Sequence, residues 1–413
     1  MAMRRRSAAL PFILVTVLLD VMGIGLLLPV LPAIVGQFAE SREAQSYWYG
    51  AMLLAFGGMQ FLCAPLLGAL SDHFGRRPVL LVSITGMGIM FAATPLVGSL
   101  AALVATRVFG GALAANFSVA NAYVADISSP ERRARGFGMI GAAFGIGFVL
   151  GPMLGGLLGH IDIRLPFFVA AGLSFVNFAY GLLVLPESLP AQRRKRIDLS
   201  RANPLAALNG LTKLAGVGLL VAVFALLNLA QFILHSVWVL YTGFRFGWGP
   251  REAGLSLFVV GLAVALVQGG LLGMLLKHVG ERKLVLAGLA SASVAYAAYG
   301  LATAGWMMYA IIGANLLGFA VAPGLNALVS KAADPREQGH AMGSLSSLGS
   351  LMAVIAPMMG APLLAAVSHL PAGDWRIGAP FFLSAALQVG ALLLAVVHFR
   401  RHPPAPHVAA EIR

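Results

Sequence analysis

The chain has 413 residues, of which 59% are hydrophobic and only 10% are charged. Soluble domains carry about 25% charged residues, so this composition excludes a soluble globular protein and indicates one that crosses a membrane many times. The formal net charge of +13 suggests nucleic-acid binding, an interpretation that the distribution of the basic residues excludes below. The single cysteine, Cys63, excludes a disulfide framework and a cysteine-based metal site.

Twelve apolar runs follow one another along the chain, each long enough to cross a hydrocarbon core as a helix. The alternation of apolar and polar residues that is typical of barrel strands is absent, and helices satisfy their backbone hydrogen bonds in lipid. The sequence therefore predicts an all-α membrane protein with twelve transmembrane helices. The expected spans are 10–34, 47–70, 79–98, 101–125, 136–159, 165–186, 214–241, 251–276, 283–303, 305–329, 339–367 and 377–398.

The 28 Lys and Arg residues are unevenly distributed among the loops. With Arg4, Arg5 and Arg6 placed in the cytoplasm, the cytoplasmic segments hold 22 of them and the opposite loops hold five, while Arg107 lies inside the fourth span. This asymmetry follows the positive-inside rule, so the basic residues indicate topology rather than binding to nucleic acid. We expect a multi-pass protein of a bacterial inner membrane with both termini in the cytoplasm and the lipid bilayer as its surroundings.

The sequence aligns with itself at an offset of 205 in three places. "GALSDHFGRRP" (68–78) matches "GMLLKHVGERK" (273–283), "SSPERRARGFG" (128–138) matches "ADPREQGHAMG" (333–343), and "GPMLGG" (151–156) matches "APMMGA" (356–361). These repeats predict two pseudo-symmetric six-helix halves, 1–189 and 214–413, joined by a basic cytoplasmic linker, 190–213. Parallel repeats of this kind place a binding site at their interface near the midplane.

Three motifs resemble the major facilitator superfamily. "GALSDHFGRRPVL" (68–80) resembles its loop 2–3 signature, Arg107 with Gly110 or Gly111 resembles its fourth-span motif, and "GIGFVLGPMLGGLLG" (145–159) resembles the fifth-span motif of its drug/proton antiporters. "LLDVMGIGLLLPVLP" (18–32), "VWVL" (237–240) and "RFGW" (245–248) are similar to the tetracycline-efflux branch. The resemblance implies a transporter that works by alternating access, without a cofactor and not an enzyme.

Asp20 and Arg107 are the charged side chains well inside the spans, and both are candidates for proton coupling. An ionised Asp at a helix centre costs ~2.5–3.5 kcal/mol, so it needs compensation. We expect Arg107 to pair with Asp20, so that protonation of Asp20 leaves Arg107 uncompensated and proton and cargo compete. A static ion pair is the alternative.

Polar side chains that share one face of an apolar helix should face the interior, because lipid penalises them. The candidate substrate-binding residues are Gln60, Asn121, Gln231, His235, Trp238, Gln268 and Asn315. An interhelical hydrogen bond is the alternative role for each amide. His235 is also a second candidate for a titrating group.

The resemblance further implies a conformational latch in loop 2–3, in which Asp72 and Arg76 form a charge network with Asp126 that holds the outward-facing state. The full candidate set is Gly68, Asp72, Gly75, Arg76, Arg77 and Asp126. Simple anchoring by positive charge is the alternative. In the fifth span, close helix packing and a bend are expected at Gly147, Gly151, Pro152, Gly155 and Gly156.

The sequence departs from the tetracycline branch at three positions. That branch has further acids in spans three and nine and a histidine in span eight, where this chain has Met90, Ala292 and Val264. The departure weakens the case for a metal–tetracycline cargo and leaves a neutral or cationic amphipathic drug equally consistent. The sequence predicts no metal site.

These observations favour proton-coupled export of small amphipathic drugs, with tetracycline-like compounds as one option, by a monomer whose partners are a small-molecule substrate and protons. An importer or facilitator on the same fold is the alternative. A membrane-embedded enzyme or receptor is a remote one, because no nucleotide loop, metal-ligand cluster or pair of catalytic carboxylates is present.

Overall fold

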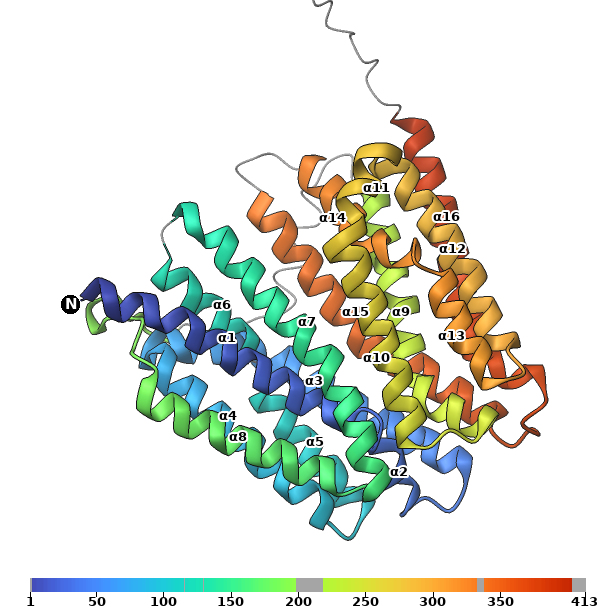
Figure 1. Cartoon of the computed structure of the whole chain (residues 1–413), viewed down its shortest axis with the longest axis horizontal. Coiled ribbons are helices and arrows are strands. Elements are labelled where there is room, and N and C mark those ends of the chain that lie inside the picture. The colour runs from blue at the N-terminus through green and yellow to red at the C-terminus, as the bar shows by residue number, and fades with distance from the viewer. Residues whose placement is uncertain (1, 115, 129, 198–217, 333–337, 403–413) are drawn as a thin grey trace, which may run out of the picture.

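A computed structural model of the chain describes residues 2–114, 116–128, 130–197, 218–332 and 338–402, and every regular element in these ranges is helical (Figure 1). It has 11 helical stretches that are long and apolar enough to cross a membrane, and a bent pair brings the number to 12. The predicted all-α fold with twelve spans is therefore confirmed. Part of the predicted linker, 198–213, lies outside the described residues.

Several spans are built from two consecutive helices. The first half contains α1 (Ala2–Leu27), α2 (Leu31–Gly36), α3 (Arg42–Phe74), α4 (Arg76–Ala93), α5 (Leu100–Leu113), α6 (Asn116–Ile127), α7 (Pro130–Ile161) and α8 (Leu165–Val184). The second half contains α9 (Gly218–Phe246), α10 (Pro250–Leu266), α11 (Leu272–Val279), α12 (Glu281–Leu301), α13 (Gly305–Ala314), α14 (Val321–Ala332), α15 (Gln338–Val367) and α16 (Ala379–Arg401).

The helix boundaries repeat at the offset found in the sequence. Helices α4 and α12 begin at residues 76 and 281, and α6 and α14 begin at residues 116 and 321. The residues that precede α4 and α12 are Gly75 and Gly280, with φ of 107° and 79°, a backbone conformation that glycine adopts without strain. The same turn therefore ends the same span in each half.

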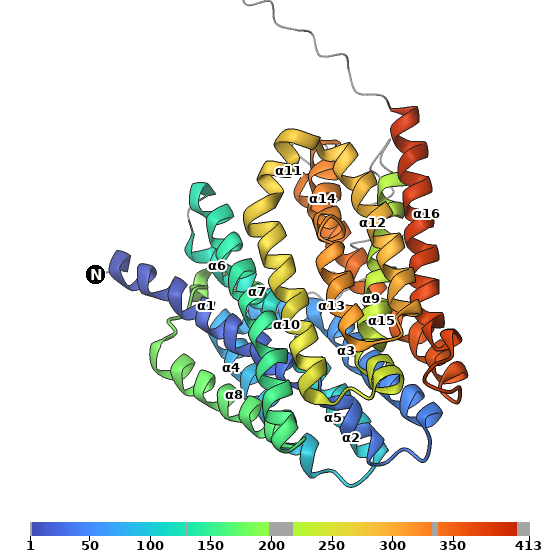
Figure 2. The same ribbon diagram turned by 45° about the vertical axis from the view of Figure 1, so that its right-hand side comes forward.

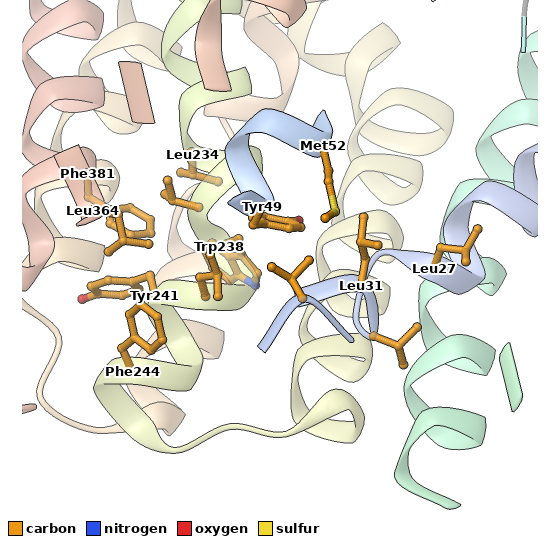
Figure 3. Packing of buried hydrophobic residues seen from close by; sticks show 14 of the residues in the cluster. Leu27, Leu31, Tyr49, Met52, Leu234, Trp238, Tyr241, Phe244, Leu364 and Phe381 are labelled. Atoms are coloured by element: carbon orange, nitrogen blue, oxygen red, sulfur yellow. The ribbon is translucent and has the colours of Figure 1, made fainter. Parts of the chain in front are cut away.

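The two halves pack against each other at one end of the molecule. This end carries residues 37–41, 162–164 and 247–249 and is called the closed end here. A Cβ atom at Gly156 of α7 would lie 2.9 Å from Gly254 Cα of α10, and one at Gly50 of α3 would lie 2.3 Å from Ala361 Cβ of α15. The largest buried apolar cluster spans both halves at this end, with Leu31 and Tyr49 from the first half and the rings of Trp238, Tyr241 and Phe381 from the second (Figure 3).

The halves separate toward the opposite end, called the linker end, which carries the turn at 74–76 and residues 185–197 (Figure 2). Each half has its own apolar cluster there, one around Phe12 and Tyr123 and the other around Val285 and Leu325. Among the described atoms, a Cβ at Gly141 or at Gly270 would meet nothing within 4 Å. The structure is therefore open at the linker end and closed at the other.

The tenth span differs from the uninterrupted helix expected over 305–329. Helices α13 and α14 meet at an angle of 53°, separated by a short 3₁₀ turn, Gly318–Ala320. The eighth span contains a π-helical segment, Val267–Leu271, between α10 and α11. Irregular backbone at membrane depth is tolerated where it is buried in protein or lines a cavity, which is where both breaks lie.

Candidate functional site

A central cavity of about 1760 Å³ lies between the two halves and includes space open to solvent. Leu28, just after α1, and helices α3 and α7 contribute to its wall from the first half, and spans seven to ten and α16 contribute from the second. The structure brings five predicted substrate-binding residues together in this wall: Gln231, His235, Trp238, Gln268 and Asn315. Gln60 lines a separate pocket, and Asn121 is not among the residues that line either space.

Aromatic rings form one side of the central cavity. The Trp238 ring packs edge-on against Tyr299 with the ring centroids 5.2 Å apart, and its Nε1 donates to Ser256 Oγ at 2.9 Å. Tyr296 and Gln388 complete this side. Gln388 is fully buried and lies beside Tyr296 in this wall.

The two backbone breaks, in spans eight and ten, lie next to each other in the cavity wall. Gln268, in the π-helical segment, donates from Nε2 to Phe319 O in the 3₁₀ turn at 3.5 Å. Asn315, where α13 ends, accepts from Ser291 Oγ at 3.0 Å. These amides therefore hold irregular backbone in place beside the cavity, a setting in which π-helical segments are frequent.

Asp20 lies in a second, smaller pocket of about 580 Å³ within the first half. Its Oδ2 accepts from Asn116 Nδ2 at 2.8 Å, and its Oδ1 accepts from Asn177 Nδ2 at 3.2 Å. Gln60 lines the same pocket and donates to Ala114 O, at the break between α5 and α6. The carboxylate is thus held by neutral amides from two neighbouring helices.

The ion pair expected between Asp20 and Arg107 is not among those of the described residues. Arg107 Nη2 donates to Thr94 Oγ1 at 2.7 Å and its guanidinium lies 6.0 Å from the centre of the Phe56 ring, with no ion pair to any described carboxylate. Arg107 and Gly111 lie one turn apart, and a Cβ at Gly111 would come within 2.3 Å of Phe56 O. This close approach fixes their common face of α5 toward α3.

Arg76 is the centre of the charge network at the linker end. Its Nη2 lies 2.6 Å from Asp72 Oδ1 and its Nε lies 3.1 Å from Asp126 Oδ2. The structure thus brings Asp72, Arg76 and Asp126 together, as the resemblance implied. All three belong to the first half, so these ion pairs do not join the halves, and they are present while the linker end is open.

Glu187, which the sequence analysis did not single out, supports the start of α4. Its carboxylate accepts from the backbone N–H of Arg76 at 2.9 Å and of Arg77 at 3.3 Å, two donors that have no partner inside the helix. A Cβ at Gly75 would lie 2.4 Å from Glu187 Oε2. Gly68 makes no such approach, because a Cβ there would meet no described atom within 4 Å.

The glycines of α7 pack closely against two helices. Cβ atoms at Gly147, Gly151 and Gly155 would come within 2.8 Å, 2.8 Å and 2.1 Å of the α1 backbone, whereas Gly156 faces α10. Pro152 lies within the helix, and a Cβ at Gly25 would be 2.9 Å from its Cδ. The close helix packing expected at the glycines of the fifth span is therefore present in the structure.

Asn116, Asn177, Gln388 and Glu187 were missed by the sequence analysis. Three of them are amides in otherwise apolar spans, the same signal that selected Gln268, and it would have found them. Glu187 carries no such signal, because an acid after a span is ordinary.

Comparison with known proteins agrees with this geometry. The family model described as Major Facilitator Superfamily matches residues 13–357. The chain is 39% identical over 380 residues to "Tetracycline resistance protein, class C" of Escherichia coli, covering 92% of this chain and 96% of that protein. It is 34% identical over 391 residues to the class D protein of Salmonella ordonez, covering 94% and 96%.

The structure is also similar to solved structures of membrane transporters. The human organic anion transporter MFSD10 superposes with a TM-score of 0.66 at 27% identity, covering 94% of this chain and 99% of that one. An inward-facing bacterial homologue of the lysosomal transporter Spinster superposes at 0.74 with 16% identity, covering 96% and 97%, which shows a shared fold. The chain therefore belongs to the major facilitator superfamily of membrane transporters.

Proposed function

We propose that the protein is a proton-coupled exporter of small amphipathic drugs, with Asp20 as the proton carrier. The observation that supports this most is a half-buried carboxylate within a membrane span, next to the central cavity, that is held by two amides and by no described cation. Ionisable groups inside membrane spans mark proton and ion pathways. Asp20 therefore alternates between a protonated and an ionised form as the cavity fills and empties.

The linker end is the cytoplasmic end in this proposal. The basic residues 193–196 and both termini lie on that side of the topology, as the positive-inside rule favours. The structure then represents the inward-facing conformation of a monomer in a bacterial inner membrane. A drug enters the central cavity from the cytoplasm and leaves after the halves rock about it.

The cavity wall favours a neutral or cationic molecule with a ring system. Its described residues include aromatic rings and amides but no Asp, Glu, Lys or Arg. Tetracyclines are candidates because relatives carry that name. Val264 and Ala292 line the wall, and the described residues contain no group of three metal ligands, so we propose a cargo that is not carried as a metal chelate.

Everted membrane vesicles test the proposal. Adding a transported drug, from a panel of tetracyclines and cationic dyes with and without Mg²⁺, should release protons from energised vesicles that contain the wild-type chain but not from vesicles that lack it. Drug movement without any proton movement would favour a facilitator. Movement out of the everted vesicles, driven by the proton gradient, would favour an importer.

A further inference from the structure

Phe144 lies where the two hollow spaces of the molecule meet. Of the described residues that line the Asp20 pocket, it is the one that also lines the central cavity. Its ring stacks on that of Phe148, one turn further along α7, with an interplanar angle of 6°. Phe148 lines the central cavity but not the pocket, so the two rings differ in the space that they border.

The backbones of α7 and α1 are held together beside Asp20. A Cβ at Gly147 would lie 2.8 Å from Leu18 O and 3.1 Å from Met22 N, the residues two positions before and after Asp20. The backbones of the two helices are thus in close contact at this level. The close packing holds α7 against α1 at this level, whereas a change of the Phe144 rotamer moves the ring out of the wall.

The Asp20 pocket has a single titratable group among its described lining residues. Asp20 is the one ionisable residue among the described residues that line it, and the others are amides, a threonine and apolar side chains. Arg107 does not line this pocket and is turned toward Phe56. A proton that moves between Asp20 and water in the central cavity therefore passes the wall that Phe144 helps to form.

We propose that Phe144 is the side chain through which a bound substrate acts on Asp20. With the cavity empty, the ring forms part of the wall between the half-buried carboxyl group and the cavity. A substrate in the cavity displaces the ring, and the proton of Asp20 then leaves to water on that side. This inference rests on the proposed function, in which Asp20 carries the coupled proton, and it makes Phe144 a positioning residue for that proton.

Chemical modification of Asp20 tests the separation directly. A water-soluble carbodiimide with glycine ethyl ester converts an accessible carboxyl group into an amide, and peptide mass analysis of the purified full-length protein reports the rate at Asp20. The Phe144→Ala substitution should speed the reaction about tenfold, which corresponds to ~1.4 kcal/mol of barrier. Phe144→Leu, which keeps apolar bulk, should react like wild type.

Phe148→Ala is the matched control, because it removes a ring from the cavity wall without opening the pocket. An unchanged rate in Phe144→Ala, or an equal increase in Phe148→Ala, would overturn the inference. If Phe144→Ala does not fold, as judged by gel filtration, Phe144→Val provides the same comparison with a smaller truncation.

Vesicle measurements separate this inference from the proposed function. Because Phe144 also lines the drug cavity, the measured quantity is the number of protons released per drug molecule exchanged, which should fall to a small fraction of the wild-type value in Phe144→Ala. If wild type itself shows no drug-evoked proton release, the proposed function fails, and the coupling role fails with it. If wild type does release protons while labelling of Asp20 is unchanged in Phe144→Ala, only the inference fails.

Discussion

Asp20 receives one hydrogen bond from α6 and one from α8, and this environment decides how it can work. Asn116 and Asn177 donate to its two oxygens at 2.8 Å and 3.2 Å. A neutral amide stabilises a carboxylate without the full compensation that a guanidinium would provide. The carboxyl group can therefore lose its charge without leaving an unpaired cation beside it, which suits a site that exchanges protons in each cycle.

The two amides should be needed for coupling. Replacing Asn116 or Asn177 by Leu removes a hydrogen bond to a charged group, which contributes ~1.5–3 kcal/mol to the ionised form. We expect drug-evoked proton release in everted vesicles to fall about tenfold at equal expression.

Asn228→Leu is the control, since Asn228 donates to Phe224 O within its own helix. Release at the wild-type rate in both Asn116→Leu and Asn177→Leu would show that these amides are packing residues alone.

The sequence could predict which residues face the cavity better than it could predict their partners. Gln231, His235 and Gln268 stand out because polar side chains are rare in apolar spans, and all three line the cavity. The partner of Arg107 depends on the rotation of one helix against another. That rotation is set by the contact of Gly111 with Phe56, which a single sequence does not contain.

At the scale of elements, α4 begins at a turn that only glycine fits well. Gly75 has φ of 107° and abuts Glu187, whereas its repeat partner Gly280 has φ of 79° and has no described neighbour within 4 Å of a Cβ. Backbone strain of this kind costs ~1–3 kcal/mol for a residue with a side chain.

Gly75→Ala should therefore destabilise the protein more than Gly280→Ala. Both substitutions add backbone strain, but only the first displaces the carboxylate that caps α4, an interaction that contributes ~0.3–1 kcal/mol more. Thermal unfolding in detergent measures the two losses. Equal losses would mean that the Glu187 cap contributes nothing to stability.

The glycine face of α7 gives a second comparison. Gly155→Ala would place a Cβ 2.1 Å from Leu26 O, whereas Gly145→Ala meets no described atom within 4 Å. Forcing a methyl group against backbone costs ~1–3 kcal/mol. We expect Gly155→Ala to lower the melting temperature and the transport rate, and Gly145→Ala to change neither; an equally damaging Gly145→Ala would contradict the packing described here.

The lengths of the spans were predictable, and the breaks within them carry local signals that the sequence analysis did not use. The span expected over 165–186 is α8, Leu165–Val184, because the thickness of the hydrocarbon sets the length of an apolar helix. The bend of the tenth span lies just before Pro323 of α14, which has no N–H to bond to Phe319 O in the 3₁₀ turn. The π-helical segment in the eighth span contains the glycine pair 269–270. The positions of the breaks could therefore be predicted, whereas the angle of 53° between α13 and α14 depends on packing between spans, which includes the contact of Gln268 with Phe319 O.

For the whole molecule, the contacts between the halves explain how one end can open while the other stays closed. At the closed end, small residues bring α7 against α10 and α3 against α15, and Arg42 of the first half lies 5.2 Å from the centre of the Phe244 ring of the second. The Arg76 network lies within one half. A rocking motion can therefore exchange the closed and open ends while that network moves as part of a rigid half.

The central claim is that Asp20 couples proton movement to drug export. Asn at this position imitates the protonated side chain in shape and charge. In proteoliposomes, Asp20→Asn should retain exchange of labelled for unlabelled drug but lose accumulation driven by a pH gradient, and Asp20→Glu should keep part of that accumulation. Accumulation by Asp20→Asn at the wild-type rate would contradict the account, because the carboxylate would then be structural.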